Sequence, residues 1–429
     1  MSVRRSILVI GVLLAIIALS YADVSASPSL VINVFRHGAR GPTQKKVDKT
    51  WDPSLYGQLT PVGMRQQYLL GAGLAKKYPN LFNKPFSNSR VYVRSSQSTR
   101  CLHSVISQLY GAFQGTGPAL NTSYPSDRAV PPYDPEIVHD LLEELSNKEV
   151  FPGGFVPIVV NSVPTSEDNV LETPSTCPAL YADAAKNVFE LKFLNFWSKT
   201  LAPTKKSLAD RGITFKSPID FKDFIDTLYC NYYQDKEMMG NITFDSELFR
   251  NLTLAATYVT YHVVYSSEKQ KSLLSVPLFD EAFQFLDNKV QGSPVEVVLL
   301  STHDTAVLTI LATLGIVNEQ CLIANFEAST RVKDMSELPF PNCIFPPFAA
   351  NVIFEFYENS GSPYVVLKYN DNAIPLCGGK SECPYQDFKD LVTKATKGYT
   401  SKDYKRICKN ELINTALDWV KDFIKKEDY

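Results

Sequence analysis

The sequence predicts an α/β protein with a central mixed β-sheet, helices on both faces of the sheet, and an inserted smaller helical cap domain. Three short apolar runs rich in β-branched residues predict buried strands, and each is followed by apolar residues at helical spacing. The middle of the chain shows helical patterns and few strand patterns. A layered α/β core interrupted by a helical insertion explains both parts of the chain.

The three predicted strands share one design, because each apolar run stops at polar residues. The runs are 30–35, ending at Arg36-His37-Gly38, 91–93, ending at Arg94-Ser95-Ser96, and 295–300, ending at Ser301-Thr302-His303-Asp304. In an open α/β sheet, ligand sites form beyond the carboxyl ends of the strands. We therefore expect these polar residues to meet at one place.

Helices are expected after each of these strands. Thr60 and Pro61 form a typical cap and first turn for the first helix. The expected helices are 63–78, 102–113 and 305–314. Two later apolar segments, 351–358 and 364–369, flank Asn-Ser-Gly-Ser and predict a hairpin that joins the sheet.

The middle segment predicts the cap. A Pro-rich stretch at 131–135 precedes helical patterns such as 180–198 and 247–265. We therefore expect a helical cap insertion at 131–265. The α/β core would then consist of 27–130 and 266–429.

The N-terminus is typical of a secretory signal peptide. Arg4 and Arg5 precede an apolar run from Ile7 to Leu19, and small residues follow. Residues 1–22 are the expected signal, with cleavage between about 22 and 26. A signal anchor is the alternative, although the run is short for a bilayer.

Other sequence features agree with an oxidising compartment. The chain has eight cysteines and three glycosylation acceptors, Asn121, Asn241 and Asn251. The cysteines show no Cys-x-x-Cys spacing, so a zinc ribbon is not indicated. We expect a protein without membrane attachment after signal removal, either secreted or in a lysosomal or vacuolar lumen.

Charge excludes one class of partner. Lys and Arg number 43 and Asp and Glu number 45, for a net charge of −2. Nucleic-acid binding needs a broad basic surface for phosphate contacts. We therefore expect no nucleic-acid partner.

The first polar motif, Arg36-His37-Gly38-Ala39-Arg40-Gly41-Pro42, suits a phosphate group. Arginine forms bidentate, charge-assisted hydrogen bonds to phosphate oxygens, and imidazole can attack phosphorus as a nucleophile. Gly38 would let the backbone approach the ligand closely. The second motif, His303-Asp304, can supply a further cation and a carboxylic acid that protonates the leaving oxygen. Taken singly, each motif is also compatible with surface charges and a turn.

These residues resemble the histidine acid phosphatases, branch two of the histidine phosphatase superfamily, of the prostatic and lysosomal type. The first motif fits the family signature R-H-G-x-R-x-P, and His303-Asp304 fits its distal His-Asp pair. The segments 57–64, 91–96, 163–168 and 228–230 also resemble stretches of the family. The likeness runs from about residue 30 to residue 410.

The resemblance implies a role for each matched residue. His37 would be the nucleophile that becomes phosphohistidine, and Asp304 the proton donor. The residues implied to bind the phosphate are Arg36, Arg40, Arg94 and His303. No metal or other cofactor is implied. One departure lies after Arg94, where Ser96-Gln97-Ser98-Thr99-Arg100-Cys101 keeps the family's second arginine but lacks the acidic residue before it.

The resemblance also implies two disulfides, Cys177 with Cys408 and Cys377 with Cys383. Cys230 matches a family cysteine whose usual partner position holds none here, so Cys343 or Cys321 could replace it. Cys101 would join whatever arrangement remains. The alternative is that some of these four are buried free thiols.

The expected function is hydrolysis of phosphomonoesters at acidic pH through a covalent phosphohistidine. The substrate would be a small-molecule phosphomonoester, and a homodimer is possible. One alternative is a phytase or other inositol-polyphosphate phosphatase, which would need several basic residues from the cap around the pocket. Another alternative is an inactive member that only binds phosphorylated ligands.

Overall fold

A mixed sheet forms the centre of the protein. The computed structural model describes residues 27–117, 150, 154, 156–172, 175–237, 239–244, 246–358 and 362–409. Within these residues, eight strands have the order β3-β2-β4-β1-β5-β6-β7, and β8 pairs with β6. The parallel strands are β1 (Leu30–Arg36), β2 (Val91–Ser96), β3 (Asn161–Val163) and β4 (Val297–Thr302). The antiparallel strands are β5 (Asn351–Tyr357), β6 (Tyr364–Tyr369), β7 (Asn372–Ala373) and β8 (Glu382–Pro384). The predicted mixed sheet and its hairpin are confirmed.

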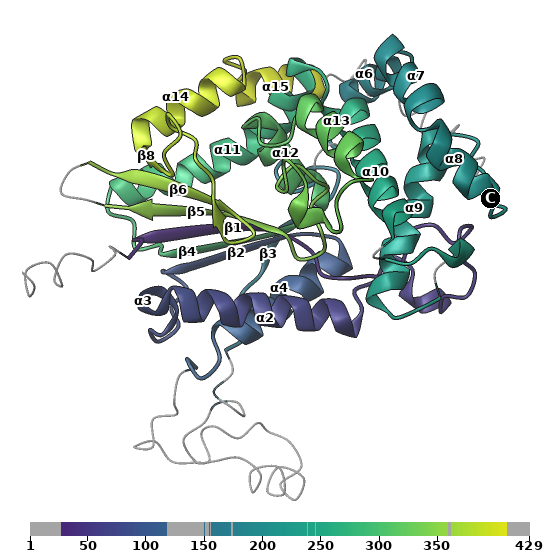
Figure 1. Ribbon diagram of the computed structural model, residues 1–429. Helices are drawn as coiled ribbons and strands as arrows, with labels where there is room; N and C mark the ends of the chain where they lie inside the picture. The colour runs from purple at the N-terminus through teal and green to yellow at the C-terminus, as the bar shows by residue number, and fades with distance from the viewer. Residues whose placement is uncertain are drawn as a thin grey trace, which may run out of the picture.

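Helices cover both faces of the sheet, as predicted (Figure 1). Alternate residues of β1 face opposite cores. Val31 and Phe35 pack with α2 (Pro61–Lys77) and α4 (Thr99–Ala112), whereas Ile32 and Val34 belong to the larger core that includes α11 (Glu268–Val290) and α12 (Asp304–Thr313). This two-residue period is what a strand buried on both faces requires. The remaining core helices are α3 (Pro79–Phe82), α13 (Glu319–Ala328), α14 (Tyr385–Ala395) and α15 (Ser401–Cys408).

The three predicted motif strands are neighbours, which brings their polar ends together. β4 lies between β1 and β2, and all three are parallel. Arg36 pairs in register with Thr302, and Ser95 pairs with Ser301. Because the carboxyl ends of parallel strands lie at the same edge, the motifs that follow them converge there.

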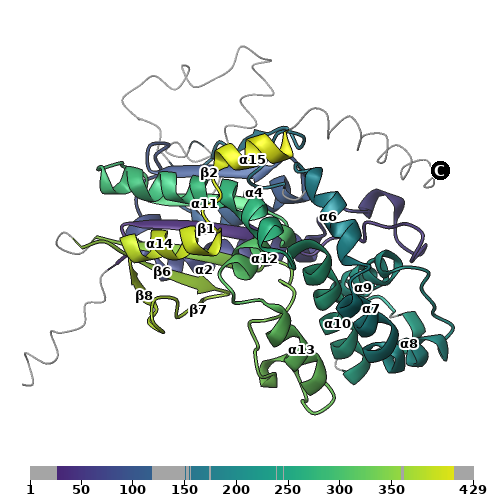
Figure 2. The ribbon, with the colours of Figure 1, turned by 90° about the horizontal axis from the view of Figure 1, so that it is seen from above.

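The middle of the chain is mostly helical. Both views place α6 (Ala179–Asn187), α7 (Leu191–Asn195), α8 (Ala202–Ala209) and α9 (Pro218–Tyr233) beyond one end of the sheet (Figures 1 and 2). The helix expected at 180–198 is broken into α6, α7 and the π-helical turn Phe196–Thr200, whereas 247–265 forms one helix, α10 (Glu247–Tyr265). β3, which lies inside the predicted cap at 131–265, pairs with β2 and so belongs to the core sheet. The other limits of the cap stay a prediction.

Three disulfides connect distant parts of the fold. Cys177–Cys408 joins the start of α6 to the end of α15, and Cys377–Cys383 closes a short turn, both as the resemblance implies. Cys321 pairs with Cys343, so the suggestion that either of them replaces the partner of Cys230 is wrong. Cys101 and Cys230 are buried free thiols, as in the alternative expected from the sequence.

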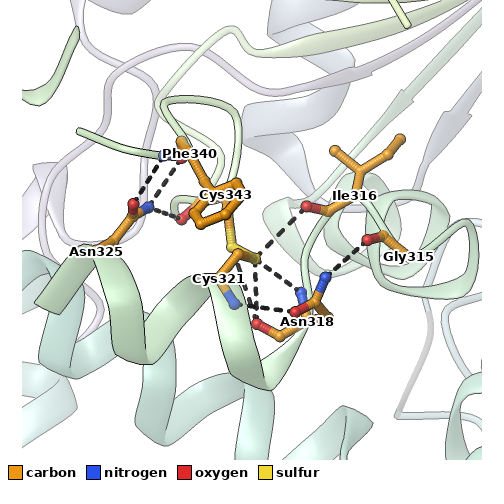
Figure 3. Close-up of a disulfide and its surroundings, with 7 residues drawn as sticks. All are labelled: Gly315, Ile316, Asn318, Cys321, Asn325, Phe340 and Cys343. Atoms are coloured by element: carbon orange, nitrogen blue, oxygen red, sulfur yellow. Dashed lines mark hydrogen bonds between the residues drawn. A yellow bond between two sulfur atoms is a disulfide. The ribbon is translucent and has the colours of Figure 1, made fainter. Parts of the chain in front are cut away.

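The Cys321–Cys343 disulfide fixes the loop before β5 to α13 (Figure 3). Beside it, Nδ2 of Asn325 donates hydrogen bonds to the carbonyls of Phe340 and Cys343, at 2.8 and 3.0 Å. The Asn318 side chain caps the start of α13. The loop held in this way continues into residues 345–348, which contribute to the site described below.

The predicted signal peptide and glycosylation sites differ in what the structure says of them. The expected signal peptide and Asn121 lie outside the described residues. Asn241 is exposed, whereas Asn251 lies inside α10 with its side-chain oxygen accepting a hydrogen bond from Ser329. Glycan acceptors lie in exposed segments, so Asn241 is the stronger candidate. Among the described helices, none combines the length and apolar character needed to cross a membrane.

Candidate active site

A cavity of about 300 Å³ lies beyond the carboxyl ends of β1 and β4. Five of the six residues expected at the site line it. The charged or titratable residues of its lining are Arg36, His37, Arg40, Arg100, Glu172, Lys222, Asp223, Asp226, His303 and Asp304. Residues from both sequence motifs, more than 260 positions apart, therefore share one cavity.

His37 is held as a neutral imidazole with one free nitrogen. Its side chain is buried, and Nδ1 lies 2.9 Å from the carbonyl oxygen of Gly38, an acceptor. Nδ1 therefore carries the proton, and Nε2 keeps its lone pair. Burial, together with the positive charges of Arg36 and Arg40, holds the pKa of His37 well below its ordinary value. A neutral imidazole of this kind is a competent nucleophile.

Gly38 sets the position of the loop that carries His37. A Cβ atom at Gly38 would lie 2.3 Å from the carbonyl oxygen of Gly63, in the first turn of α2. A Cβ at Gly63 would lie 2.1 Å from the carbonyl oxygen of Ala39. The close approach that glycine permits here is to α2, which differs from the expected approach to a ligand.

Arg36 and Arg40 are fixed by groups on opposite sides. Nη1 of Arg36 donates to the carbonyl of Pro346 at 2.6 Å, and its guanidinium lies 4.2 Å from the centre of the Phe348 ring. Arg40 forms two hydrogen bonds to the Asp226 carboxylate of α9, at 2.8 and 3.0 Å. Both cations are buried, so an anion bound between them would be desolvated and strongly attracted.

Asp304 begins α12 and lies 2.9 Å from Nη2 of Arg36. Burial would raise the pKa of Asp304, but the positive charges of Arg36, Lys222 and Arg40 outweigh it and lower that pKa. With no anion bound, Asp304 is therefore a carboxylate.

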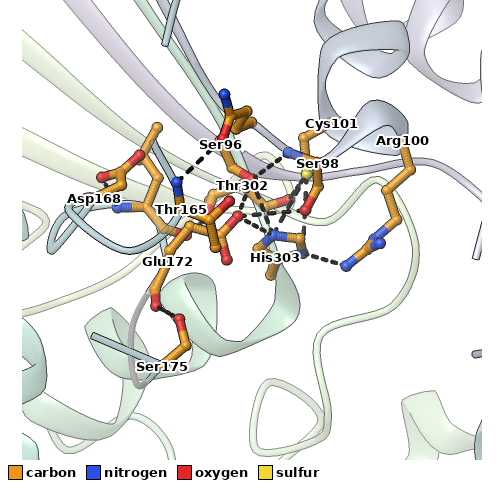
Figure 4. Close-up of polar contacts among 12 residues, drawn as sticks. Ser96, Ser98, Arg100, Cys101, Thr165, Asp168, Glu172, Ser175, Thr302 and His303 are labelled. Atoms are coloured by element: carbon orange, nitrogen blue, oxygen red, sulfur yellow. Dashed lines mark hydrogen bonds and ion pairs between the residues drawn. The ribbon is translucent and has the colours of Figure 1, made fainter. Parts of the chain in front are cut away.

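Glu172 holds His303 (Figure 4). Oε1 of Glu172 lies 3.1 Å from Nε2 of His303 and also accepts hydrogen bonds from the hydroxyls of Ser96 and Ser98. Burial opposes a charged imidazole, but Cys101 and Glu172 outweigh it and raise the pKa of His303 to about 9. His303 is therefore a cation over the whole acidic and neutral range.

Arg100 approaches His303 from the other side. Its Nη2 lies 3.3 Å from Nδ1 of His303 (Figure 4). Burial, and the nearby charge of Arg40, lower the pKa of Arg100. Four positive side chains, Arg36, Arg40, Arg100 and His303, thus surround the neutral His37. Such a group of buried cations is most stable when it binds a multiply charged anion.

The sequence of the chain matches the family model described as histidine phosphatase superfamily (branch 2) over residues 29–370. The chain belongs to this family. Lysosomal acid phosphatase from Xenopus laevis is 23% identical over 402 residues, covering 89% of this chain and 81% of that protein. Human prostatic acid phosphatase is 24% identical over 379 residues, covering 84% of this chain and 83% of that protein. Among solved structures, a Citrobacter braakii phytase has the same fold, with a TM-score of 0.59, 13% identity, and coverage of 86% and 98%. The predicted phosphoric monoester hydrolase is confirmed at the level of the family.

One predicted residue of this histidine phosphatase site, Arg94, lies away from the cavity lining. Arg94 is absent from the described lining of the cavity, and its guanidinium binds Asp168 at 2.6 Å and Glu281 at 2.7 Å. Tyr92 and Arg94 share one face of β2, and this face packs against α11, which carries Glu281. Arg100, at the start of α4, points into the cavity in its place. The role of Arg94 as a phosphate ligand therefore stays a prediction, and its ion pairs here favour a structural role.

Sequence reasoning also missed Glu172, Asp226 and Lys222. Arg100 could have been found from the sequence, because the family that the chain resembles also has an arginine at this position. Asp226 and Lys222 are one turn apart on α9 and had no distinguishing pattern. Glu172 lies 131 positions before His303 and follows no strand, so only the tertiary structure reveals it. In the described part of the chain, no group of His, Cys, Asp and Glu side chains is arranged to hold a metal ion.

The two arginines provide a direct comparison. Arg100→Ala is expected to lower kcat/KM for aryl phosphates by about 10²- to 10³-fold, because it removes a preorganised cation from the phosphate pocket. Arg94→Ala should leave kcat/KM of the folded enzyme within about threefold of wild type but destabilise the protein by about 3–5 kcal/mol, because it removes the positive partner of the buried Asp168 carboxylate. Steady-state kinetics and urea unfolding of both variants separate the two roles. Reversed results would restore Arg94 to the site.

Glu172 should control the charge of His303. Glu172→Gln removes the carboxylate that favours the imidazolium, so the pKa of His303 should fall from about 9. A group with a raised pKa is charged below that pKa, so the variant should lose activity at neutral pH while keeping most of it at pH 5. The measurement is kcat/KM from pH 4 to 9, with NMR titration of His303. Glu190→Gln is the matched control, since Glu190 pairs with His262 outside the cavity. If the alkaline limb of the kcat/KM profile is the same in Glu172→Gln and wild type, Glu172 does not control the charge of His303.

Proposed function

We propose that the protein hydrolyses phosphomonoesters in two steps through a phosphate group carried on Nε2 of His37. The observation that supports this best is a neutral, buried imidazole, with its Nε2 free, surrounded by buried cations. In the first step, Nε2 of His37 bonds to phosphorus, the ester P–O bond breaks, and Asp304 donates its proton to the leaving alcohol. In the second step, Asp304 takes a proton from water, the oxygen bonds to phosphorus, and the N–P bond breaks.

The cations account for stabilisation of the transferring phosphate. Arg36, Arg40, Arg100 and His303 come from β1, the loop after β1, α4 and the end of β4, so their positions are set by the sheet edge. Because Arg36, Arg40 and His303 are buried and each is held by a neighbouring group, little reorganisation is needed when charge develops on the phosphate oxygens.

Acidic pH provides the proton that Asp304 needs. In the free protein, burial acts to raise the pKa of Asp304, but the positive charge of Arg36 acts in the opposite direction and the net result is a lowered pKa. A bound phosphate dianion counters the same positive charges, so it should raise the pKa of Asp304 and favour its acid form. The alkaline limb of kcat, which reports the bound complex, should therefore lie at higher pH than the ionisation of free Asp304.

The test is chemical trapping of the intermediate. The purified protein would be mixed with ³²P-labelled p-nitrophenyl phosphate at pH 5 and quenched rapidly, and the labelled peptide mapped under conditions that preserve phosphohistidine. Label on the peptide that contains His37, formed within one turnover, supports the proposal. Turnover without any protein-bound label would exclude the covalent route.

We also propose that the protein acts in the secretory pathway, either as a secreted protein or in a lysosomal or vacuolar lumen. Three disulfides support an oxidising compartment. Immunofluorescence of the tagged full-length protein, compared with a variant that lacks residues 1–22, would show whether this segment directs it there.

A further inference from the structure

We infer that the natural substrate is a phosphomonoester that carries an aliphatic chain, and that the chain lies in an apolar groove next to the catalytic cavity. The groove lies between α6, α9 and α10, and α10 packs against both other helices (Figure 2). The inference rests on the proposed function, because phosphate bound at His37 determines where the rest of the substrate begins.

The groove is large and apolar. Its volume is about 780 Å³, more than twice that of the catalytic cavity. Its lining includes Ala185 and Val188 of α6, Ile219 of α9, and Val259, Val263 and Val264 of α10. This volume and composition match sites that bury an apolar ligand.

The groove and the catalytic cavity adjoin at one wall. Lys222, Asp223 and Thr260 line both of them. A chain attached to the phosphate oxygen can leave the cavity over these three residues, along the methylene stem of Lys222. The position of the groove beside the catalytic cavity therefore favours an occupant that is part of the substrate.

Exposure of the groove favours an apolar occupant. Ile219 has 70% of its surface exposed, and it lines the groove together with the buried Val259 and the half-buried Val263 and Val264 of α10. Covering such an apolar side chain removes it from water and so favours binding of an apolar group. A substrate chain would cover Ile219 on each binding event.

Charge on the cavity wall argues against the inositol-polyphosphate alternative. Such a substrate needs several cations from the cap helices. In the described lining, α9 contributes Lys222 but also the carboxylates of Asp223 and Asp226, and Glu172 adds another. Asp226 and Glu172 are paired with Arg40 and His303, so α9 offers one cation, Lys222, with the Asp223 carboxylate beside it, to additional phosphate groups. A single phosphate on an uncharged chain needs no additional cations.

The experiment compares n-alkyl phosphates from two to ten carbons, each below its micelle concentration, with p-nitrophenyl phosphate as the short reference substrate. In the wild type, kcat/KM should rise about two- to fourfold for each added methylene until the groove is filled. Ile219→Asp and Ala185→Asp place a charge on opposite walls and should lower kcat/KM for decyl phosphate at least tenfold. Both should leave p-nitrophenyl phosphate within about twofold of wild type. Leu69→Asp is the matched control, since Leu69 is also exposed but lies on α2.

The possible outcomes separate the two claims. No hydrolysis of p-nitrophenyl phosphate by the wild type overturns the proposed function itself. Hydrolysis that is independent of chain length, or faster with myo-inositol hexakisphosphate than with decyl phosphate, overturns only the groove inference. The groove inference is also overturned if Ile219→Asp changes the oligomeric state measured by light scattering while kcat/KM still depends on the length of the alkyl chain. The groove would then bind a second copy of the protein.

Discussion

Replacing His37 by alanine is expected to lower kcat by at least about 10⁴-fold for every phosphomonoester, because no other group in the cavity can accept the phosphate. The thermal unfolding midpoint should stay close to that of wild type, since His37 faces a cavity and its ring makes one side-chain hydrogen bond, to Gly38. Stopped-flow assays with p-nitrophenyl phosphate and circular dichroism measure both properties.

His103→Ala serves as the control for this variant. His103 is exposed on α4, so its removal tests for nonspecific loss of a histidine. It should keep wild-type activity and wild-type labelling in the trapping experiment. Should His37→Ala keep more than a few per cent of wild-type activity, His37 would be a binding residue and another nucleophile would be required.

The second large effect is expected for Asp304→Asn, and it should depend on the leaving group. Hydrolysis of alkyl phosphates should slow by about 10²- to 10⁴-fold, because an alkoxide leaves poorly without a proton. Hydrolysis of p-nitrophenyl phosphate should slow much less, because p-nitrophenolate leaves without protonation. The measurement is a plot of log kcat against leaving-group pKa, which should be flat for wild type and steep for the variant.

Asparagine keeps the size of the side chain, so the helix start at α12 should remain intact. Loss of the ion pair with Arg36 could also change phosphate binding, and the inhibition constant of inorganic phosphate measures that effect separately. Parallel losses on alkyl and aryl substrates would assign Asp304 to phosphate binding and remove it from proton transfer.

Much of the fold was predictable because its signals are local. The run Leu30 to Phe35 is apolar at every position except Asn33 and rich in β-branched residues, which is typical of a strand buried on both faces. The polar motifs after β1 and β4 lie at strand ends, and parallel pairing then brings His37 and Asp304 together without further information. The helix α10 was predictable to the residue because its apolar pattern continues without a break.

Arg94 shows what local signals cannot provide. The predicted strand ended at residue 93, whereas β2 continues to Ser96. Inside a strand, Arg94 points along the face that packs on α11, where Asp168 and Glu281 bind it. Moving the end of the strand by three residues moves the first residue able to reach the cavity to Arg100.

Long-range partners were likewise decided by the tertiary structure. Cys230 lies 3.5 Å from Arg40 and finds no disulfide partner, and Glu172 meets His303 across 131 positions. The sequence by itself determined the three motif strands and the convergence of their polar ends, and it predicted His37 as nucleophile and Asp304 as acid. The tertiary structure decided which arginine lines the cavity, which carboxylate pairs with His303, and which apolar helices border the cavity. The physical reason is that periodicity acts over neighbouring residues, whereas ion pairs, disulfides and cavities depend on distances that only the packing of helices on the sheet establishes.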